Sequence, residues 1–195
     1  MRISRRSAST ALLYSRAEMR RSFNEAASET AIVVTVVTLD RVTKLYIQRA
    51  FSPADMKPVI PGFFNIVHWE NPGAAFSLLA DSPTAWSSAL LVGVSLAVMA
   101  VIAVMLWRPR RANMMPSSPL MRTALALVFG GALGNLWDRL FRGTVTDFLL
   151  FIFGSYEFPA FNVADSAITI GAGLLLIDLW RTRNHHPAPQ SDAGR

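Results

Sequence analysis

The sequence contains no cysteine and only three histidines among its 195 residues. The absence of cysteine excludes disulfides, thiolate zinc sites and cysteine nucleophiles. Two histidines, His185 and His186, stand in a polar tail, and His68 stands alone in a region with the composition of a strand. A metal site built on histidines is therefore not expected. The chain also lacks the glycine-rich motifs that bind phosphates, and no cofactor is predicted.

Charged residues are scarce as well. They make up 16% of the chain, compared with roughly 25% in an ordinary soluble domain. Hydrophobic residues reach 52%, and the mean hydropathy is +0.33. A soluble domain of this length could not bury so much apolar surface, whereas a membrane protein does not need to. The composition therefore predicts an integral membrane protein with a single domain.

Four apolar stretches are long enough to cross a bilayer, at about residues 31–49, 85–107, 120–140 and 162–180. The stretch at 85–107 is the only one without a charged residue. Four crossings would place both ends of the chain on the same side of the membrane.

The number of lysine and arginine residues alternates between high and low in the segments that flank these stretches. Six stand in the N-terminal tail, one clear case (Lys57) in the first connecting loop, four in the second loop, one (Arg142) in the third, and three in the C-terminal tail. Cytoplasmic segments carry the excess of positive charge in membrane proteins. The alternation therefore predicts cytoplasmic tails at 1–30 and 183–195 around a four-span domain at 31–182. The net charge of +6 is explained by this pattern, so nucleic acid is not an expected partner.

The first outer loop, about residues 50–84, contains a β-prone run from Phe63 to Trp69 between Pro-Gly and Asn-Pro-Gly turns. This pattern predicts a short strand pair or meander at the membrane surface. The predicted fold is therefore an all-α integral membrane protein with four transmembrane helices and a small extracytoplasmic β-structure. The polar tail after Arg183 is expected to be disordered.

Carboxylates next to hydrocarbon are costly, so their positions are informative. The topology places three of them near the outer interface, namely Asp138, Asp147 and Asp165. Two facing aspartates can share one proton, because like charges a few ångströms apart do not both ionise readily. One then acts as general base on a water, and the other donates a proton to the leaving group. No histidine lies in a span or in the second outer loop, so a Ser-His-Asp triad is not visible.

Each of these residues also has a purely structural interpretation. Asp165 could help to cap the fourth helix with Asn162 as the N-cap, and Asp147 could be a solvated loop residue. Asp138 could pair with Arg139 at the end of the third span. Asp40 and Lys44, four residues apart, would form an ion pair on one helix face, and the GxxxG spacing of Gly130 and Gly134 favours close helix packing. Taken singly, the residues do not decide between these alternatives.

Five motifs follow one another along the chain. They are Asp40-Arg41-Val42-Thr43-Lys44, Asn71-Pro72-Gly73-Ala74-Ala75-Phe76-Ser77, Gly130-Gly131-Ala132-Leu133-Gly134-Asn135-Leu136-Trp137-Asp138-Arg139, Gly143-Thr144-Val145-Thr146-Asp147-Phe148 and Phe158-Pro159-Ala160-Phe161-Asn162-Val163-Ala164-Asp165-Ser166. In kind and order they resemble the motifs of lipoprotein signal peptidases, also called signal peptidase II, and the resemblance covers about residues 32–182. Two departures are Arg41, where the family usually has Gln, and Thr146, where Val is common.

The resemblance implies a role for each motif residue. Asp147 and Asp165 would be the catalytic pair of an aspartic endopeptidase that uses no metal. Asp138 would be structural, paired with Arg139 or its neighbours, and the first outer loop would form a β-cradle on the membrane surface. Residues expected to line, hold or support the site are Asn71, Asn135, Arg139, Asn162, Asp40 and Lys44.

The implied reaction is removal of the signal peptide from a prolipoprotein, just before a cysteine that carries diacylglycerol. The resemblance also implies a monomer in the bacterial cytoplasmic membrane, in contact with lipid, with its site at the extracytoplasmic face. Two other classes of function are compatible with the composition. A proton-coupled transporter would use charged residues near mid-membrane and often shows repeat symmetry, and a non-catalytic assembly factor would tolerate loss of Asp147.

Overall fold

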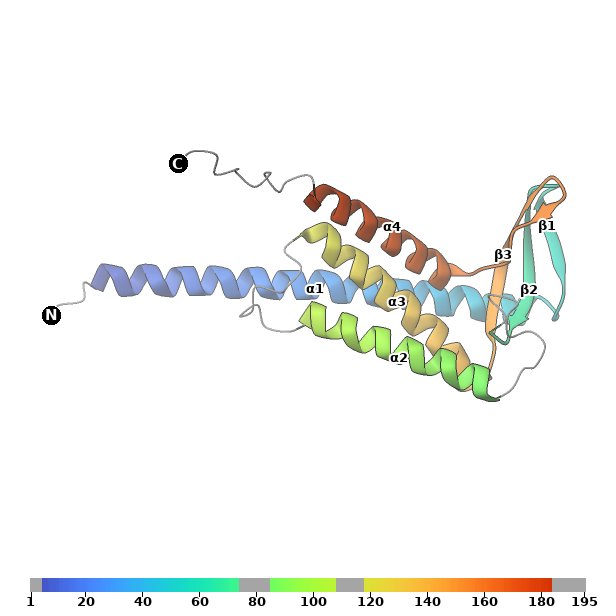
Figure 1. Cartoon of the computed structure of the whole chain (residues 1–195), viewed down its shortest axis with the longest axis horizontal. Coiled ribbons are helices and arrows are strands. Elements are labelled where there is room, and N and C mark those ends of the chain that lie inside the picture. The colour runs from blue at the N-terminus through green and yellow to red at the C-terminus, as the bar shows by residue number, and fades with distance from the viewer. Residues whose placement is uncertain (1–4, 74–84, 108–117, 184–195) are drawn as a thin grey trace, which may run out of the picture.

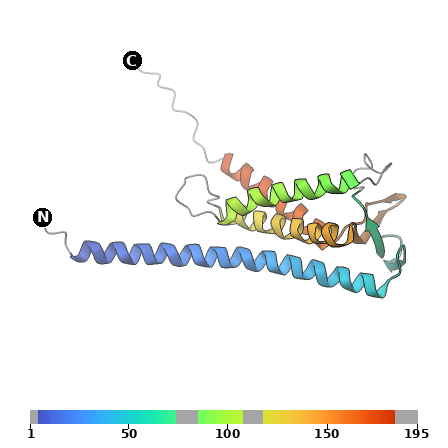
Figure 2. The ribbon, with the colours of Figure 1, turned by 90° about the horizontal axis from the view of Figure 1, so that it is seen from below.

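Four long helices lie side by side, and a small antiparallel sheet covers one end of the bundle (Figure 1). This computed structural model describes residues 5–73, 85–107 and 118–183. The polar tail predicted after Arg183 lies outside the described residues, as does the part of the Asn-Pro-Gly motif from residue 74 onward. In both views the sheet stands at the end of the bundle opposite the start of the first helix (Figure 2).

The first helix, α1, runs from Arg5 to Ala50 and is much longer than the predicted span at 31–49. No glycine or proline occurs between these two residues, so nothing in the sequence stops the helix before the apolar stretch. Pro53 follows shortly after its end. The N-terminal segment therefore continues the helix out of the bundle (Figure 1).

The other helices match the predicted stretches closely. They are α2 (Ala85–Trp107), α3 (Pro119–Arg142) and α4 (Val163–Arg183). All three are long and apolar enough to cross a membrane. In the described part of the chain α1 is long enough but is not apolar enough by the same measure, because it contains charged residues. Helix α3 begins after Ser118, whose Oγ accepts a hydrogen bond from the Leu120 N–H at 3.1 Å. It ends at Gly143, which adopts the left-handed conformation with φ 78°.

The sheet has the order β1-β2-β3-β4, with β1 at Met56–Ile60, β2 at Phe64–Asn71, β3 at Val145–Phe153 and β4 at Tyr156–Glu157. The predicted strand pair in the first outer loop is β1 and β2. Strand β3 was not predicted, and it pairs antiparallel with β2 so that Trp69 lies opposite Asp147 and Asn71 lies opposite Val145. The long-range pairing of β2 and β3 joins the two outer loops into one structure.

Small residues on α3 allow the helices to approach closely. A side chain at Gly134 would meet the Asp40 carboxylate at 2.7 Å, and one at Gly130 would meet Val36 of α1 at 3.0 Å. At Gly131 an added methyl group would lie 2.4 Å from the Ala164 carbonyl oxygen of α4. The packing interpretation of the GxxxG spacing is therefore correct, and the glycines of α3 contact α1 on one face and α4 on the other.

The interior of the bundle contains buried charged residues beside its apolar core, and much of its outside is apolar. Asp40, Lys44 and Asp138 are fully buried, while Val42 of α1 and Leu176 of α4 are 59% and 68% exposed. At the end away from the sheet, Arg122 of α3 is ion-paired with Glu29 of α1. Paired charges inside and large apolar side chains outside fit helices surrounded by lipid.

Candidate active site

The start of α4 fixes the position of Asp165. The Asn162 side-chain oxygen accepts a hydrogen bond from the Asp165 N–H at 3.0 Å, and the Asp165 carboxylate accepts one from the Asn162 N–H at 3.2 Å. These reciprocal bonds form a capping box. The capping interpretation of Asp165 is thus correct, and it holds the carboxylate rigidly at the end of the helix nearest the sheet.

Asp147 lies in β3, where it is only 5% exposed. Its two carboxylate oxygens accept hydrogen bonds from the side-chain amides of Asn71 at 3.0 Å and Asn162 at 2.8 Å. Asn71 belongs to β2, so the pairing of β2 with β3 places this donor beside the carboxylate. The structure therefore does not support a solvated loop residue at position 147.

Asn162 and Asn135 connect the two aspartates. Asn162 donates to Asp147 and also to the Asn135 oxygen at 3.2 Å. Asn135 in turn donates to the Asp165 carboxylate at 2.7 Å. The network thus joins α3, α4 and β3 around the two carboxyl groups, and every bond in it has ordinary geometry.

The two aspartates line one cavity of about 730 Å³, which is large enough for a peptide segment or a ligand of comparable size. Its polar wall contains Arg139, whose Nε is buried and has no hydrogen-bond partner among the described residues. Its apolar wall comes from α4 and from the segment before α4. The lining residues are Asn71, Asn135, Arg139, Val145, Asp147, Phe158, Pro159, Ala160, Phe161, Asp165, Ser166, Thr169 and Ile170.

Burial raises the pKa of Asp147 to about 6. The hydrogen bond from Asn71 opposes this effect, the charge of Asp165 adds to it, and the hydrogen bond from Asn162 opposes it again. A carboxyl group with this pKa exchanges its proton near neutral pH. Acid–base chemistry requires such a group.

A buried ion cluster lies behind the cavity and supports it. The Lys44 ammonium lies 2.9 Å from carboxylate oxygens of both Asp40 and Asp138, and it donates to Asn135 at 2.9 Å. Asp40 also accepts a hydrogen bond from the backbone N–H of Ala164 at 3.1 Å, at the start of α4. The predicted pair of Asp40 and Lys44 is present, and the cluster links α1 to both α3 and α4.

The predicted pairing of Asp138 with Arg139 is wrong. Asp138 is ion-paired with Arg41 and Lys44 of α1. Arg41 also lies over the Trp137 ring at 5.7 Å. Neighbouring residues of a helix point in different directions, so Asp138 faces α1 while Arg139 faces the cavity. The sequence could not reveal this because it does not show which helix packs on which face.

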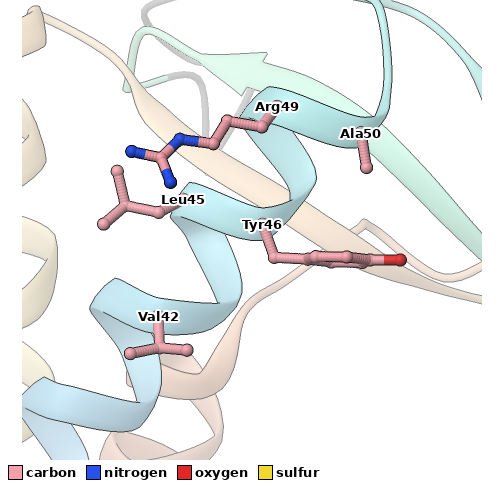
Figure 3. A pocket seen from close by; sticks show the side chains of 5 residues that line it. All are labelled: Val42, Leu45, Tyr46, Arg49 and Ala50. Atoms are coloured by element: carbon pink, nitrogen blue, oxygen red, sulfur yellow. The ribbon is translucent and has the colours of Figure 1, made fainter.

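A second, more open pocket of about 410 Å³ lies on α1 and contains no carboxylate, histidine, serine or lysine among its described lining residues (Figure 3). Val42 and Leu45 provide apolar surface, and Arg49 provides the only charge. Figure 3 shows the Arg49 and Leu45 side chains extending to one side of the helix and the Tyr46 ring to the other. Its residue types offer no hydrolytic chemistry, so the cavity with the aspartates is the candidate active site.

The sequence did not identify Glu70, a half-buried residue of β2 that contacts several side chains next to Asp147. The one sequence feature that could have indicated a role for Glu70 is its position directly before Asn71, the first residue of a motif. Among the described residues no group of three or more histidine, aspartate or glutamate side chains could hold a metal ion.

The family model for signal peptidase (SPase) II matches residues 32–181. A lipoprotein signal peptidase of Solibacter usitatus is 43% identical over 152 residues, which cover 78% of this chain and 90% of that protein. One from Cupriavidus taiwanensis is 44% identical over 156 residues, covering 80% and 84%.

Two solved structures described as bacterial membrane enzymes are also similar. One has a TM-score of 0.69 at 32% identity and covers 83% of this chain and 93% of that one. The other has a TM-score of 0.66 at 33% identity, covering 78% and 92%.

Proposed function

The chain belongs to the signal peptidase II family, and we propose that Asp147 and Asp165 are the catalytic pair with which it removes signal peptides from prolipoproteins. It is a protease of the aspartic type and a bacterial membrane protein. The observation that carries the proposal is that both carboxyl groups line one cavity and are joined through Asn162 and Asn135.

In this mechanism one aspartate is ionised and takes a proton from a water that attacks the scissile carbonyl. The other is protonated, polarises the carbonyl, and then gives its proton to the departing amine. The raised pKa of Asp147 keeps a proton available in the pair near neutral pH. The two groups titrate as a unit, so the shared proton belongs to the pair.

The other polar residues of the cavity hold these groups or the substrate. Asn71 and Asn162 fix Asp147 by donating to both of its oxygens, and Asn135 fixes Asp165. Arg139 lines the same cavity, so its guanidinium is proposed to donate to a substrate carbonyl. Asp40 and Lys44 support the site from behind.

We propose α1 as a fourth membrane span over about residues 31–49, a length of about 28 Å. Within it, Asp40 and Lys44 are fully buried against α3 and Arg41 is ion-paired with Asp138, while apolar residues such as Val34, Leu39 and Val42 are exposed. Tyr46 and Arg49 near its end are side chains that favour the membrane interface.

We propose that both ends of the chain lie in the cytoplasm and that the sheet and the two aspartates lie at the extracytoplasmic face. The positive charge of the tails supports this orientation. In this arrangement the 31–182 domain contains the whole site, with 1–30 and 183–195 as tails. The sheet then serves as the cradle on the membrane surface. Exposed apolar residues at its far end, including Ile60 and Phe153, suit contact with lipid.

The proposed substrate is a prolipoprotein whose cysteine carries diacylglycerol. The cavity joins a polar wall of amides and carboxylates to an apolar wall from α4, so it can hold a peptide bond next to a lipid chain. The proposal takes the enzyme to act as a monomer, with Asp147 and Asp165 of one chain lining one cavity.

Cleavage of a purified diacylglyceryl prolipoprotein in the presence of a chelator tests this function. Wild-type protein should cleave it and should leave the same precursor without lipid intact, whereas Asp147→Asn should be inactive. Asp178→Asn is the matched control, because Asp178 lies thirteen residues after Asp165 on the same helix. Full activity of Asp147→Asn would refute the assignment, and equal cleavage of the unlipidated precursor would refute the proposed substrate.

A further inference from the structure

A polar cluster lies on the face of the sheet opposite the catalytic cavity. Side chains alternate between the two faces of a strand, so Asn71 and Asp147 face the cavity while Glu70 and Thr146 face the other way. Glu70 and Thr146 are directly paired across β2 and β3, next to the pairing of Trp69 with Asp147. The cluster is therefore immediately behind the strand that carries Asp147.

Glu70 is the centre of this cluster. One of its carboxylate oxygens accepts a hydrogen bond from Thr144 at 2.6 Å. The other accepts hydrogen bonds from Thr146 and from Arg142, both at 3.1 Å, and lies 3.0 Å from the His68 ring. The two threonines flank Val145, so a single carboxylate holds the start of β3 on either side of this residue.

The cluster also joins the sheet to two helices. Gln48 of α1 donates to the Thr146 hydroxyl at 2.7 Å and accepts from Arg142, at the end of α3, at 3.0 Å. The other His68 ring nitrogen lies 2.9 Å from the Phe51 carbonyl oxygen, just after α1.

We propose that Glu70 is a positioning residue for the peptidase reaction, which holds β2 and β3 in register so that Asn71 and Asp147 face the cavity correctly. This inference rests on the proposed catalytic role of Asp147. Glu70 does not line the cavity in the described part of the chain, so its effect passes through the strands to the reacting group.

The groups around Glu70 keep its carboxyl group ionised, as this positioning role requires. Burial raises its pKa, but hydrogen bonds from Thr144, His68 and Thr146 and the charge of Arg142 outweigh burial and lower it overall. The cluster therefore holds a carboxylate, and an amide in its place would present a donor to groups that themselves donate.

The test measures kcat and KM for the lipidated precursor with Glu70→Gln, Thr146→Val and the double variant. A small displacement of a catalytic group reduces kcat by about 10- to 100-fold, so each single variant should lose that much while KM changes less than about twofold. Because both residues act through one cluster, the double variant should be no slower than about the slower single variant.

Glu157→Gln is the matched control, since it makes the same chemical change at an exposed position in β4. Each variant is assayed well below its unfolding midpoint, with kcat expressed per folded enzyme. A Glu70→Gln variant with wild-type kcat overturns the inference. So does a loss of kcat that disappears once the rate is expressed per folded enzyme, and so do losses of kcat that multiply in the double variant. The Asp147→Asn result is independent of these outcomes, so failure of the catalytic pair would be recognised separately.

Discussion

Replacing Lys44 by methionine should destabilise the enzyme strongly even though Lys44 does not line the cavity. Its ammonium is fully buried between Asp40 and Asp138, at 2.9 Å from each carboxylate, and donates to Asn135. Methionine has a similar shape and no charge. The substitution therefore leaves two buried carboxylates without their shared cation.

The size of the destabilisation depends on the partners that Asp40 and Asp138 keep in the variant. Removing one partner of a buried ion pair destabilises a protein by about 3–5 kcal/mol. Asp138 keeps Arg41, and Asp40 keeps the hydrogen bond from the Ala164 N–H, so the lower end of this range, about 3 kcal/mol, is expected. In a chain of this size each kcal/mol shifts Tm by about 2–4 °C, which gives a decrease of about 6–12 °C.

Thermal unfolding of the detergent-purified protein measures this shift. The control is Lys57→Met, at an exposed position in β1, which should leave Tm within about 1 °C of wild type because surface changes have small effects. A Lys44→Met protein as stable as this control would refute the view that the cluster holds α1 against α3 and α4. A second variant, Lys44→Met with Asp40→Asn, should recover part of the loss because it removes one uncompensated charge.

Three further predictions follow from the same geometry. Because the mechanism needs one protonated and one ionised aspartate, kcat/KM should be bell-shaped in pH with its alkaline limb near the pKa of Asp147, about 6; a flat profile from pH 4 to 9 would contradict this. The pKa of Asp147 is raised in the folded state from its ordinary value of 3.8 to about 6. Between these two pH values the folded protein binds more protons than the unfolded chain, so it loses about 3 kcal/mol of stability as the pH rises from 3.8 to about 6. Asp147→Asn should therefore gain Tm relative to wild type between pH 4 and pH 7, and a constant difference would refute the shift. Gly131→Ala should lower Tm and kcat together, because the methyl group would lie 2.4 Å from the Ala164 carbonyl oxygen and displace Asp165; unchanged Tm and kcat would show that the helices have room to separate.

The helices and the family could be predicted from the sequence because their signals are local. The apolar run at 85–107 coincides with α2, and the bounds of α3 and α4 differ from prediction by only a few residues. Asp147 and Asp165 were predicted to share a site from the order of the motifs. The structure brings both to one cavity, while their catalytic role stays a proposal for experiment.

Features that depend on pairing between distant segments could not be predicted. Strand β3 forms because β2 is available beside it, about 80 residues earlier in the chain. Asp138 is ion-paired with Arg41 and Lys44 of α1, more than ninety residues earlier in the chain, and not with its neighbour Arg139. The length of α1 was also missed, because a polar helix without glycine or proline has no apolar pattern to mark its extent.

Single-turnover cleavage of the lipidated precursor by Asp147→Asn, Asp165→Asn and the double variant tests the catalytic pair most directly. Residues that act as one unit are not additive. Each single variant should lose about 10²- to 10⁴-fold or more in rate, and the double variant should be no slower than the singles. Losses that multiply in the double variant, or a single variant that keeps near-wild-type activity, would contradict a shared-proton pair at Asp147 and Asp165.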